Sequence, residues 1–126
     1  MNALVVRALL NLYGFYGDEL TVECPTGSGT RMTLFEVARE ISDRLTRLFL
    51  RGEDGRRPVH GGQTKFQQDP HRRDPISFHA YFHGDNAGIG AAHQAGWTGL
   101  VATLMTVFGT LTPGDLRTDP ARSTKR

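Results

Sequence analysis

The feature that most constrains this chain is its first segment, residues 2–16, which is apolar on nearly every side when arranged as a helix. Arg7 is its charged residue, and Asn11 is the polar side chain in its interior. A helix that is apolar all round must be surrounded by protein. Its apolar run of about 14 residues is too short to cross a bilayer. The sequence therefore predicts a first helix that needs more neighbours than a few short helices supply, and no membrane partner.

Composition narrows the class of protein. The chain has 126 residues, 15 Lys and Arg against 13 Asp and Glu, and 38% hydrophobic residues, which fits one domain or part of one. The basic residues lie mostly in loop-like segments and the tail, without interleaved aromatics, so no nucleic-acid partner is expected. The single cysteine, Cys24, excludes an intramolecular disulfide and fits a reducing compartment, so we expect a cytoplasmic location.

A second helix is predicted after residue 33. Thr33 followed by Glu36 has the spacing of a capping box, in which each residue's side chain bonds the other's backbone N–H. Apolar residues then recur at helical spacing with charged residues opposite them, and these are Leu34, Val37, Ile41, Leu45 and Leu48. The helix is expected to end near residues 50–52.

Two further helices are predicted. Asp74 followed by Pro75 has the pattern of an N-cap with proline at the first helical position, so a short helix is expected up to about Phe82. An apolar face over residues 94–108, with Gly109 as a C-cap, predicts the last helix. Residues 18–31 and 51–73 are interpreted as long loops, and no alternating strand pattern is found. The predicted fold is all-α, with residues 1–109 as one segment and 110–126 as a mobile basic tail.

The run from Glu23 to Thr30 is either a polar turn before a helix or a ligand-lining loop. Thr30 and Arg31 stand where a phosphate-binding loop needs Lys followed by Ser or Thr. If the run lines a ligand site, Glu23 is the important residue, because a carboxylate offers two acceptor oxygens to sugar hydroxyls.

His79 and His83 lie four residues apart, with Asp85 and His93 nearby. On a helix, that spacing places two imidazoles on one face, where they could bind a metal. No metalloprotease-type motif surrounds them. Hydrogen-bonding roles are therefore favoured, and the sequence predicts neither a metal nor a cofactor.

Residues 81–90 combine aromatics, an imidazole, a carboxylate, an amide and glycines. Such groups suit a carbohydrate, which has apolar C–H faces and a rim of hydroxyls, while glycines let the backbone approach a ligand. A purely structural loop is the alternative. Trp97 follows, either as a core residue, which its helical spacing favours, or as a stacking platform for a sugar.

These motifs resemble the C-terminal part of bacterial glycoside hydrolases of family 63, relatives of mannosyl-oligosaccharide glucosidase and mannosylglycerate hydrolase. The resemblance runs over residues 2–108 and implies part of an (α/α)6 toroid. It also implies inverting hydrolysis by two carboxyl groups about 6.5–9.5 Å apart. The motifs that carry it are Glu23-Cys24-Pro25-Thr26-Gly27-Ser28-Gly29, Asp69-Pro70-His71 with Arg73-Asp74, Tyr81-Phe82-His83-Gly84-Asp85-Asn86, His93-Gln94, and Gly96-Trp97-Thr98-Gly99-Leu100-Val101.

Two departures from the family pattern bear on activity. Ala80 stands where the family carries the glutamate that looks like the general base, and no region matches the earlier half that supplies the general acid. The resemblance therefore implies a fragment or degenerate relative of a glucosidase-like enzyme that is inactive as an isolated chain.

The expected ligand is a small sugar or glycoside, and the expected partner is either the missing N-terminal part of the domain or a second copy. No catalytic residue is assigned. The alternative is a small non-catalytic helical module that binds sugar or a protein through the two long loops. The predicted cavity-lining residues are Glu23, His83, Asp85, His93, Gln94 and Trp97.

Overall fold

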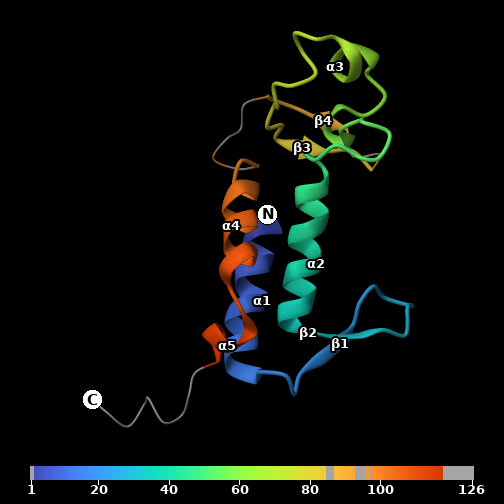
Figure 1. The fold of residues 1–126 in the computed structure, drawn as a ribbon. Coiled ribbons are helices and arrows are strands. Elements are labelled where there is room, and N and C mark those ends of the chain that lie inside the picture. Colours follow the sequence, from blue (N-terminus) through green and yellow to red (C-terminus); the bar gives the residue numbers. More distant parts are fainter. Residues whose placement is uncertain (1, 85–86, 93–95, 97, 118–126) are drawn as a thin grey trace. The chain divides into compact units, whose positions relative to one another are not determined.

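The structure, a computed structural model, describes residues 2–84, 87–92, 96 and 98–117. The chain divides into two compact units, unit 1 with Met1–Ser42 and Thr106–Arg126, and unit 2 with Asp43–Met105. In chain order (Figure 1) the elements are α1 (Asn2–Tyr16), β1 (Thr21–Glu23), β2 (Arg31–Thr33), α2 (Leu34–Arg47), the 3₁₀ turn η1 (Pro58–His60), α3 (Thr64–Gln68), β3 (Tyr81–Phe82), β4 (Gly88–Ile89), α4 (Val101–Thr110) and α5 (Pro113–Leu116).

The predicted all-α fold, a partial (α/α)6 toroid, is wrong. The described residues form five α-helices together with two small antiparallel sheets, β1–β2 and β3–β4. Each strand has only two or three residues. Strands this short leave no stretch of alternating polarity long enough to be recognised in a sequence.

The segment predicted as a loop over residues 18–31 contains the first hairpin. Its register pairs Thr21 with Thr33 and Glu23 with Arg31. The Arg31 guanidinium Nε donates to the Thr21 hydroxyl at 2.9 Å, which ties the two strands together outside the backbone ladder. In the turn, Gly29 has a φ of 71°, a conformation that favours glycine.

One face of α1 builds the core of unit 1. Its predicted bounds are confirmed, and Tyr13 and Val6 are its buried side chains. The Tyr13 ring packs on Phe35 with centroids 5.6 Å apart, and the edge of the Phe108 ring meets Phe35 at 5.8 Å. The core cluster comprises Tyr13, Leu34 and Phe35, flanked by Leu9, Leu10, Phe108, Leu111 and Leu116.

The opposite side of α1 is left exposed. We call it the outward face, and it consists of Leu4, Val5, Ala8, Leu12, Phe15 and Tyr16. Phe15 is 82% exposed. Among the described residues, no helix has both the length and the apolar character needed to cross a membrane.

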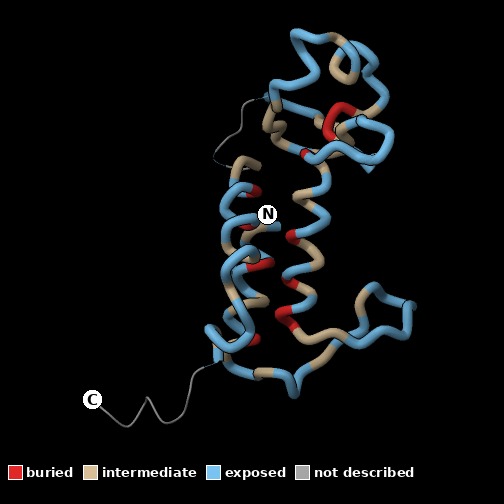
Figure 2. The backbone as a smooth tube through the Cα atoms, in the orientation of Figure 1, coloured by how far each residue is buried: buried red, intermediate tan, exposed pale blue. Residues whose placement is uncertain are grey.

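The predicted capping box at the start of α2 is confirmed. The Thr33 backbone N–H donates to Glu36 Oε2 at 2.7 Å, and the Glu36 N–H donates to Thr33 Oγ1 at 3.3 Å. Figure 2 shows that the buried positions recur along one side of this helix. They are Leu34, Phe35, Ala38 and Ser42.

Unit 2 has its own aromatic core. Phe49 contacts the rings of Phe78 and Phe82 with centroids 5.5 Å and 5.8 Å away. Val59 and Val101 complete the buried cluster, and Leu48 and Ile76 pack against it.

The predicted helix from Asp74 to Phe82 is wrong, since this segment has no helical turn and ends in β3. Asp74, the expected N-cap, forms a different hydrogen bond, in which Arg51 Nη2 donates to Asp74 Oδ1 at 2.5 Å. The last helix begins at Val101 rather than at 94, although residues 93–95 and 97 lie outside the described part, and it continues through Gly109 to Thr110.

Within the segment predicted as a basic tail, residues 113–116 form α5. The carboxylate of Asp115 accepts hydrogen bonds from the Thr112 backbone N–H at 2.8 Å and from its hydroxyl at 2.6 Å. Residues 118–126 lie outside the described part of the chain.

Replacing Thr33 with alanine removes one half of the α2 capping box. We expect Thr33→Ala to lower the free energy of unfolding by about 1 kcal/mol, measured by urea denaturation followed by circular dichroism. Thr103, an exposed residue inside α4, provides the control, because Thr103→Ala removes a similar side chain without touching a cap. Equal losses in both variants would contradict the role given to this cap.

Candidate functional site

The candidate site is the hairpin of β3 and β4 in unit 2. Its register pairs Tyr81 with Ile89 and Phe82 with Gly88. The ladder extends beyond the strands, since the His83 N–H donates to the Ala87 carbonyl at 2.8 Å and the Ala80 N–H donates to the Ala91 carbonyl at 3.0 Å. The segment that the sequence singled out for carbohydrate chemistry is thus shaped by backbone hydrogen bonds.

The hairpin has one face in the core and one in solvent. Phe82 packs edge-on against Phe49, whereas Tyr81 is 67% exposed. Successive side chains of a strand point to opposite sides, so Tyr81 and His83 share the solvent side, and both are exposed. Ile89, the partner of Tyr81 across the hairpin, is exposed as well. The solvent face therefore presents an aromatic ring, an imidazole and an aliphatic side chain together.

Two glycines let the hairpin lie close to its surroundings. A Cβ at Gly88 would lie 2.2 Å from Cδ2 of His79, and a Cβ at Gly61 would lie 2.6 Å from the Ala87 methyl. Real side chains do not tolerate such distances. The hairpin consequently packs on His79 and on the loop after η1 only because neither glycine carries a side chain.

The Gln67 side chain fixes the loop that supports the hairpin. Its amide nitrogen donates to the carbonyls of Arg57 at 2.9 Å and Gly61 at 3.0 Å, while its oxygen accepts the Arg57 backbone N–H at 3.0 Å. The ring of Phe66 stacks on His60 with centroids 5.7 Å apart. The short helix α3 thereby fixes an irregular loop through the side chains of Gln67 and Phe66.

Three buried polar atoms in this region have no hydrogen-bond partner among the residues that the structure describes. They are Arg57 Nε, His60 Nε2 and His79 Nδ1. His60 is only 7% exposed, and burial lowers the pKa of its imidazole, with the Arg57 charge and His79 acting in the same direction. His60 therefore favours its neutral form in the folded chain.

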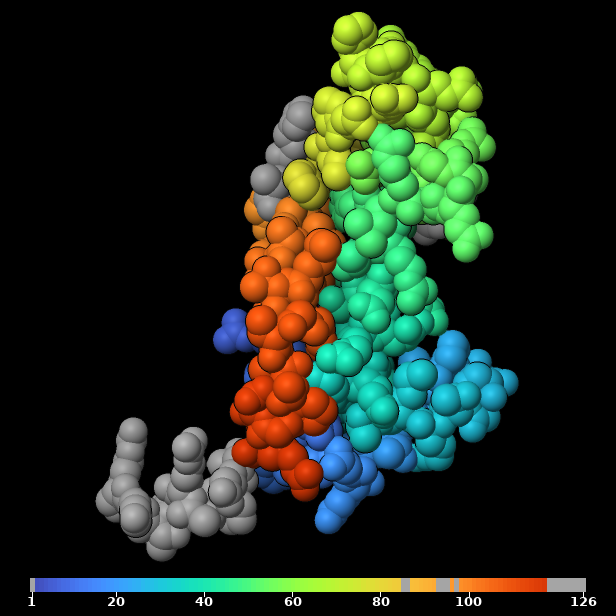
Figure 3. Space-filling model, in the orientation of Figure 1, coloured from blue at the N-terminus to red at the C-terminus, as the bar shows by residue number. Residues whose placement is uncertain are grey.

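The structure describes two of the six predicted site residues. Glu23 lies at the end of β1 in unit 1, where its Oε1 accepts the Gly29 N–H at 2.6 Å. Figure 3 shows the surrounding hairpin turn, coloured blue to cyan, standing out from the surface of unit 1, and residues 25–31 are exposed. His83 lies directly after β3 in unit 2.

The other four predicted residues lie outside the described part of the chain, and these are Asp85, His93, Gln94 and Trp97. His79 and His83 do not share a helical face as the metal interpretation assumed, because β3 lies between them. Across the described residues, no group of three or more potential metal-binding side chains is found.

Sequence reasoning missed two residues of this region. Tyr81 belongs to the Tyr81-Phe82-His83-Gly84 motif but is not among the predicted contact residues, although an aromatic preceding a glycine-rich turn is a usable signal. His60 carried no signal, since it stands in a segment without periodicity whose structure depends on Gln67 and Phe66.

Comparison with known proteins identifies one relative of unassigned role. The chain is 45% identical over 109 residues to the uncharacterized protein YMR196W of Saccharomyces cerevisiae. The match covers 84% of this chain and 10% of that protein, so the chain spans about a tenth of the length of the curated relative it matches. No family model matches the chain, and no solved structure matches it significantly.

A methyl group at position 88 should push the hairpin off His79. We expect Gly88→Ala to destabilise unit 2 by about 1–3 kcal/mol, the usual cost of an overpacked contact, measured by hydrogen exchange of the hairpin amides. Gly62 is the matched control, since a Cβ there has nothing within 4 Å. Similar exchange in both variants would show that the close approach to His79 is not required.

The buried imidazole of His60 makes stability depend on pH. The folded-state pKa lies below the ordinary value near 6.5, so the unfolded chain binds the proton more readily. The contribution of neutral His60 to the free energy of unfolding is complete above about pH 6.5. It is lost as the pH falls through the lowered folded-state pKa of His60.

We expect His60→Gln to flatten the fall in denaturation midpoint below pH 6.5, whereas His71→Gln, at an exposed position, leaves it intact. An NMR titration of the His60 ring in the unmodified chain checks the same point. A ring that titrates at or above its ordinary pKa would contradict the buried neutral form.

Proposed function

We propose that this chain is a sugar-binding part of a glucosidase-like glycoside hydrolase related to family 63, without hydrolytic activity of its own. It takes part in carbohydrate metabolism by contributing one wall of a binding cavity for a small sugar or glycoside. The solvent face of the β3–β4 hairpin is the contact surface.

The observation that carries this proposal is the exposure of Tyr81. An exposed aromatic ring offers apolar surface that a ligand or partner can cover. Here the ring stands beside Ile89 and shares its side of the hairpin with His83. A sugar ring offers C–H groups to the aromatic face and hydroxyls to an imidazole.

The motif pattern adds a second line of support. The Tyr-Phe-His-Gly run that resembles family 63 coincides with β3 and the residues after it. Proposed further contacts, carried over from the resemblance, are Asp85, His93, Gln94 and Trp97. Glu23, which lies in unit 1, is proposed as a separate sugar contact. These residues come from separate segments of the chain.

Lack of hydrolysis follows from the residue at position 80. Ala80 precedes β3, and its methyl group lies where a Cβ at Gly90 would contact it at 3.4 Å. A methyl group cannot take a proton from water, and a general base typically contributes about 10²–10⁴-fold to a rate. An acid from another polypeptide segment would be required as well.

The proposal includes a partner and a location. The partner is further polypeptide that completes the cavity, and the compartment is the reducing cytoplasm, which the single Cys24 favours. The alternative function is a small non-catalytic module that binds sugar or protein by itself. Added polypeptide that completes the cavity would strengthen sugar binding under the first proposal and would leave it unchanged under the second.

Sugar binding is tested by NMR titration of the purified chain with glucose, mannose and glycerol-linked sugars. We expect millimolar binding with shifts at Tyr81, His83 and Ile89, and no hydrolysis of aryl-glucosides above the uncatalysed rate. Tyr81→Ala should weaken binding about 10-fold, the scale of one aromatic contact.

Two control variants sharpen the result. Tyr81→Phe keeps the ring and should retain most of the affinity, and Tyr16→Ala removes an exposed aromatic of unit 1 and should change nothing. Absence of binding at high millimolar sugar would overturn the sugar-binding role, and turnover by the pure chain would overturn the role given to Ala80.

A further inference from the structure

The outward face of α1 carries no charge and has the spacing of a helix-packing surface. Val5, Ala8, Leu12 and Phe15 are separated by three, four and three residues, the intervals at which side chains line one seam between two helices. At about 100° per residue, the whole outward face spans roughly 120° of the helix. Arg7 lies about 120° from the centre of this face by the same geometry.

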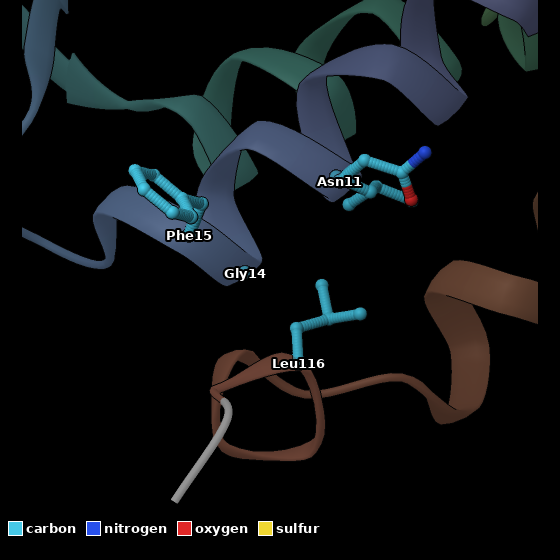
Figure 4. A pocket seen from close by; sticks show the side chains of 5 residues that line it. Asn11, Gly14, Phe15 and Leu116 are labelled. Atoms are coloured by element: carbon cyan, nitrogen blue, oxygen red, sulfur yellow. The ribbon is translucent and has the colours of Figure 1, made fainter. Parts of the chain in front are cut away.

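A groove borders this face within unit 1. It has a volume of about 640 Å³ and lies between α1 and α5 (Figure 4), lined by Leu10, Asn11, Gly14, Phe15 and Leu116. Gly14 lets the backbone of α5 approach α1 here, because a Cβ there would lie 3.1 Å from the Leu116 carbonyl oxygen. The exposed Phe15 ring forms its edge toward the outward face.

We propose that the outward face of α1 binds the same face of a second copy of this chain, with the two helices antiparallel. An antiparallel alignment centred on residue 10 sets Leu4 against Phe15, Val5 against Tyr16, and Ala8 against Leu12. Each small or medium side chain then opposes a larger one, as close packing requires. The antiparallel helix dipoles are also favourable.

The groove supports the antiparallel direction. It lies at the C-terminal half of α1, and this alignment brings Leu4 of the second copy to the Phe15 end of it. A parallel pair would instead set Phe15 against Phe15 and Leu4 against Leu4 of the second copy. No side chain of the second copy would then enter the groove.

The area fits a specific pair. Covering the exposed parts of two aromatic rings and four aliphatic side chains removes roughly 500 Å² per copy from water, given that one fully enclosed aromatic ring buries about 150–250 Å². The total of roughly 1,000 Å² reaches the size at which interfaces become specific. Patches of this size on a monomer usually mark a binding surface.

The oligomeric state of the full chain tests this proposal. Light scattering after size exclusion should give twice the chain mass of 13.9 kDa at high concentration and dissociation on dilution. Leu12→Glu places a charge in the centre of the face and should weaken the pair about 100-fold. Its circular dichroism should stay unchanged, because Leu12 is 46% exposed in the folded unit.

Met105→Glu is the matched control, since Met105 lies on α4 and is 49% exposed. It should leave the pair intact. A chain that stays monomeric at every concentration, or an association that Leu12→Glu does not weaken, would overturn the proposal and leave the face to a different polypeptide.

Disulfide trapping tests the direction of the helices. In a Cys24→Ser background, chains carrying Ala8→Cys are mixed with chains carrying Leu12→Cys and oxidised. The antiparallel alignment predicts mixed disulfides between positions 8 and 12, because facing Cα atoms then come within disulfide reach. Disulfides formed only between identical chains would show a parallel pair and overturn the antiparallel arrangement.

Discussion

The rest of this structure depends on the excess of apolar surface on α1. Its inward face is fixed by the buried Tyr13 ring, which packs on Phe35 while its hydroxyl donates to Asp18 at 2.7 Å. Arg117, beyond α5, reaches the same carboxylate at 3.2 Å. Leu4, Val5, Leu12, Phe15 and Tyr16 on the outward face stay exposed, so a helix that the sequence predicts to be enclosed has one face in water.

The two long helices were predictable because their side-chain patterns are long. α2 combines a capping box with four turns of helical spacing, and each signal is local in sequence. The hairpins were not predictable in the same way, since two or three residues per strand give no period. Asp74 shows a different limit, because its expected role as a cap is displaced by Arg51, 23 residues away.

For the candidate site, the sequence showed which chemical groups are present but not how they are arranged in space. The chemistry of residues 81–90 pointed to the hairpin, but nothing in the sequence divided Phe82 in the core from Tyr81 in solvent. The close approaches at Gly61 and Gly88 depend on contacts between distant segments. Both proposals nevertheless have the same physical basis, namely apolar side chains that are exposed to solvent on well-packed units. Each proposal therefore names a ligand or partner that covers them.

Hydroxyl-radical footprinting of the full chain tests the central claim, that the outward face of α1 is covered in solution. The account predicts that modification of Leu12 and Phe15 falls as protein concentration rises, while Met105 on α4 is modified equally throughout. Modification of Leu12 and Phe15 that does not change with protein concentration would contradict it.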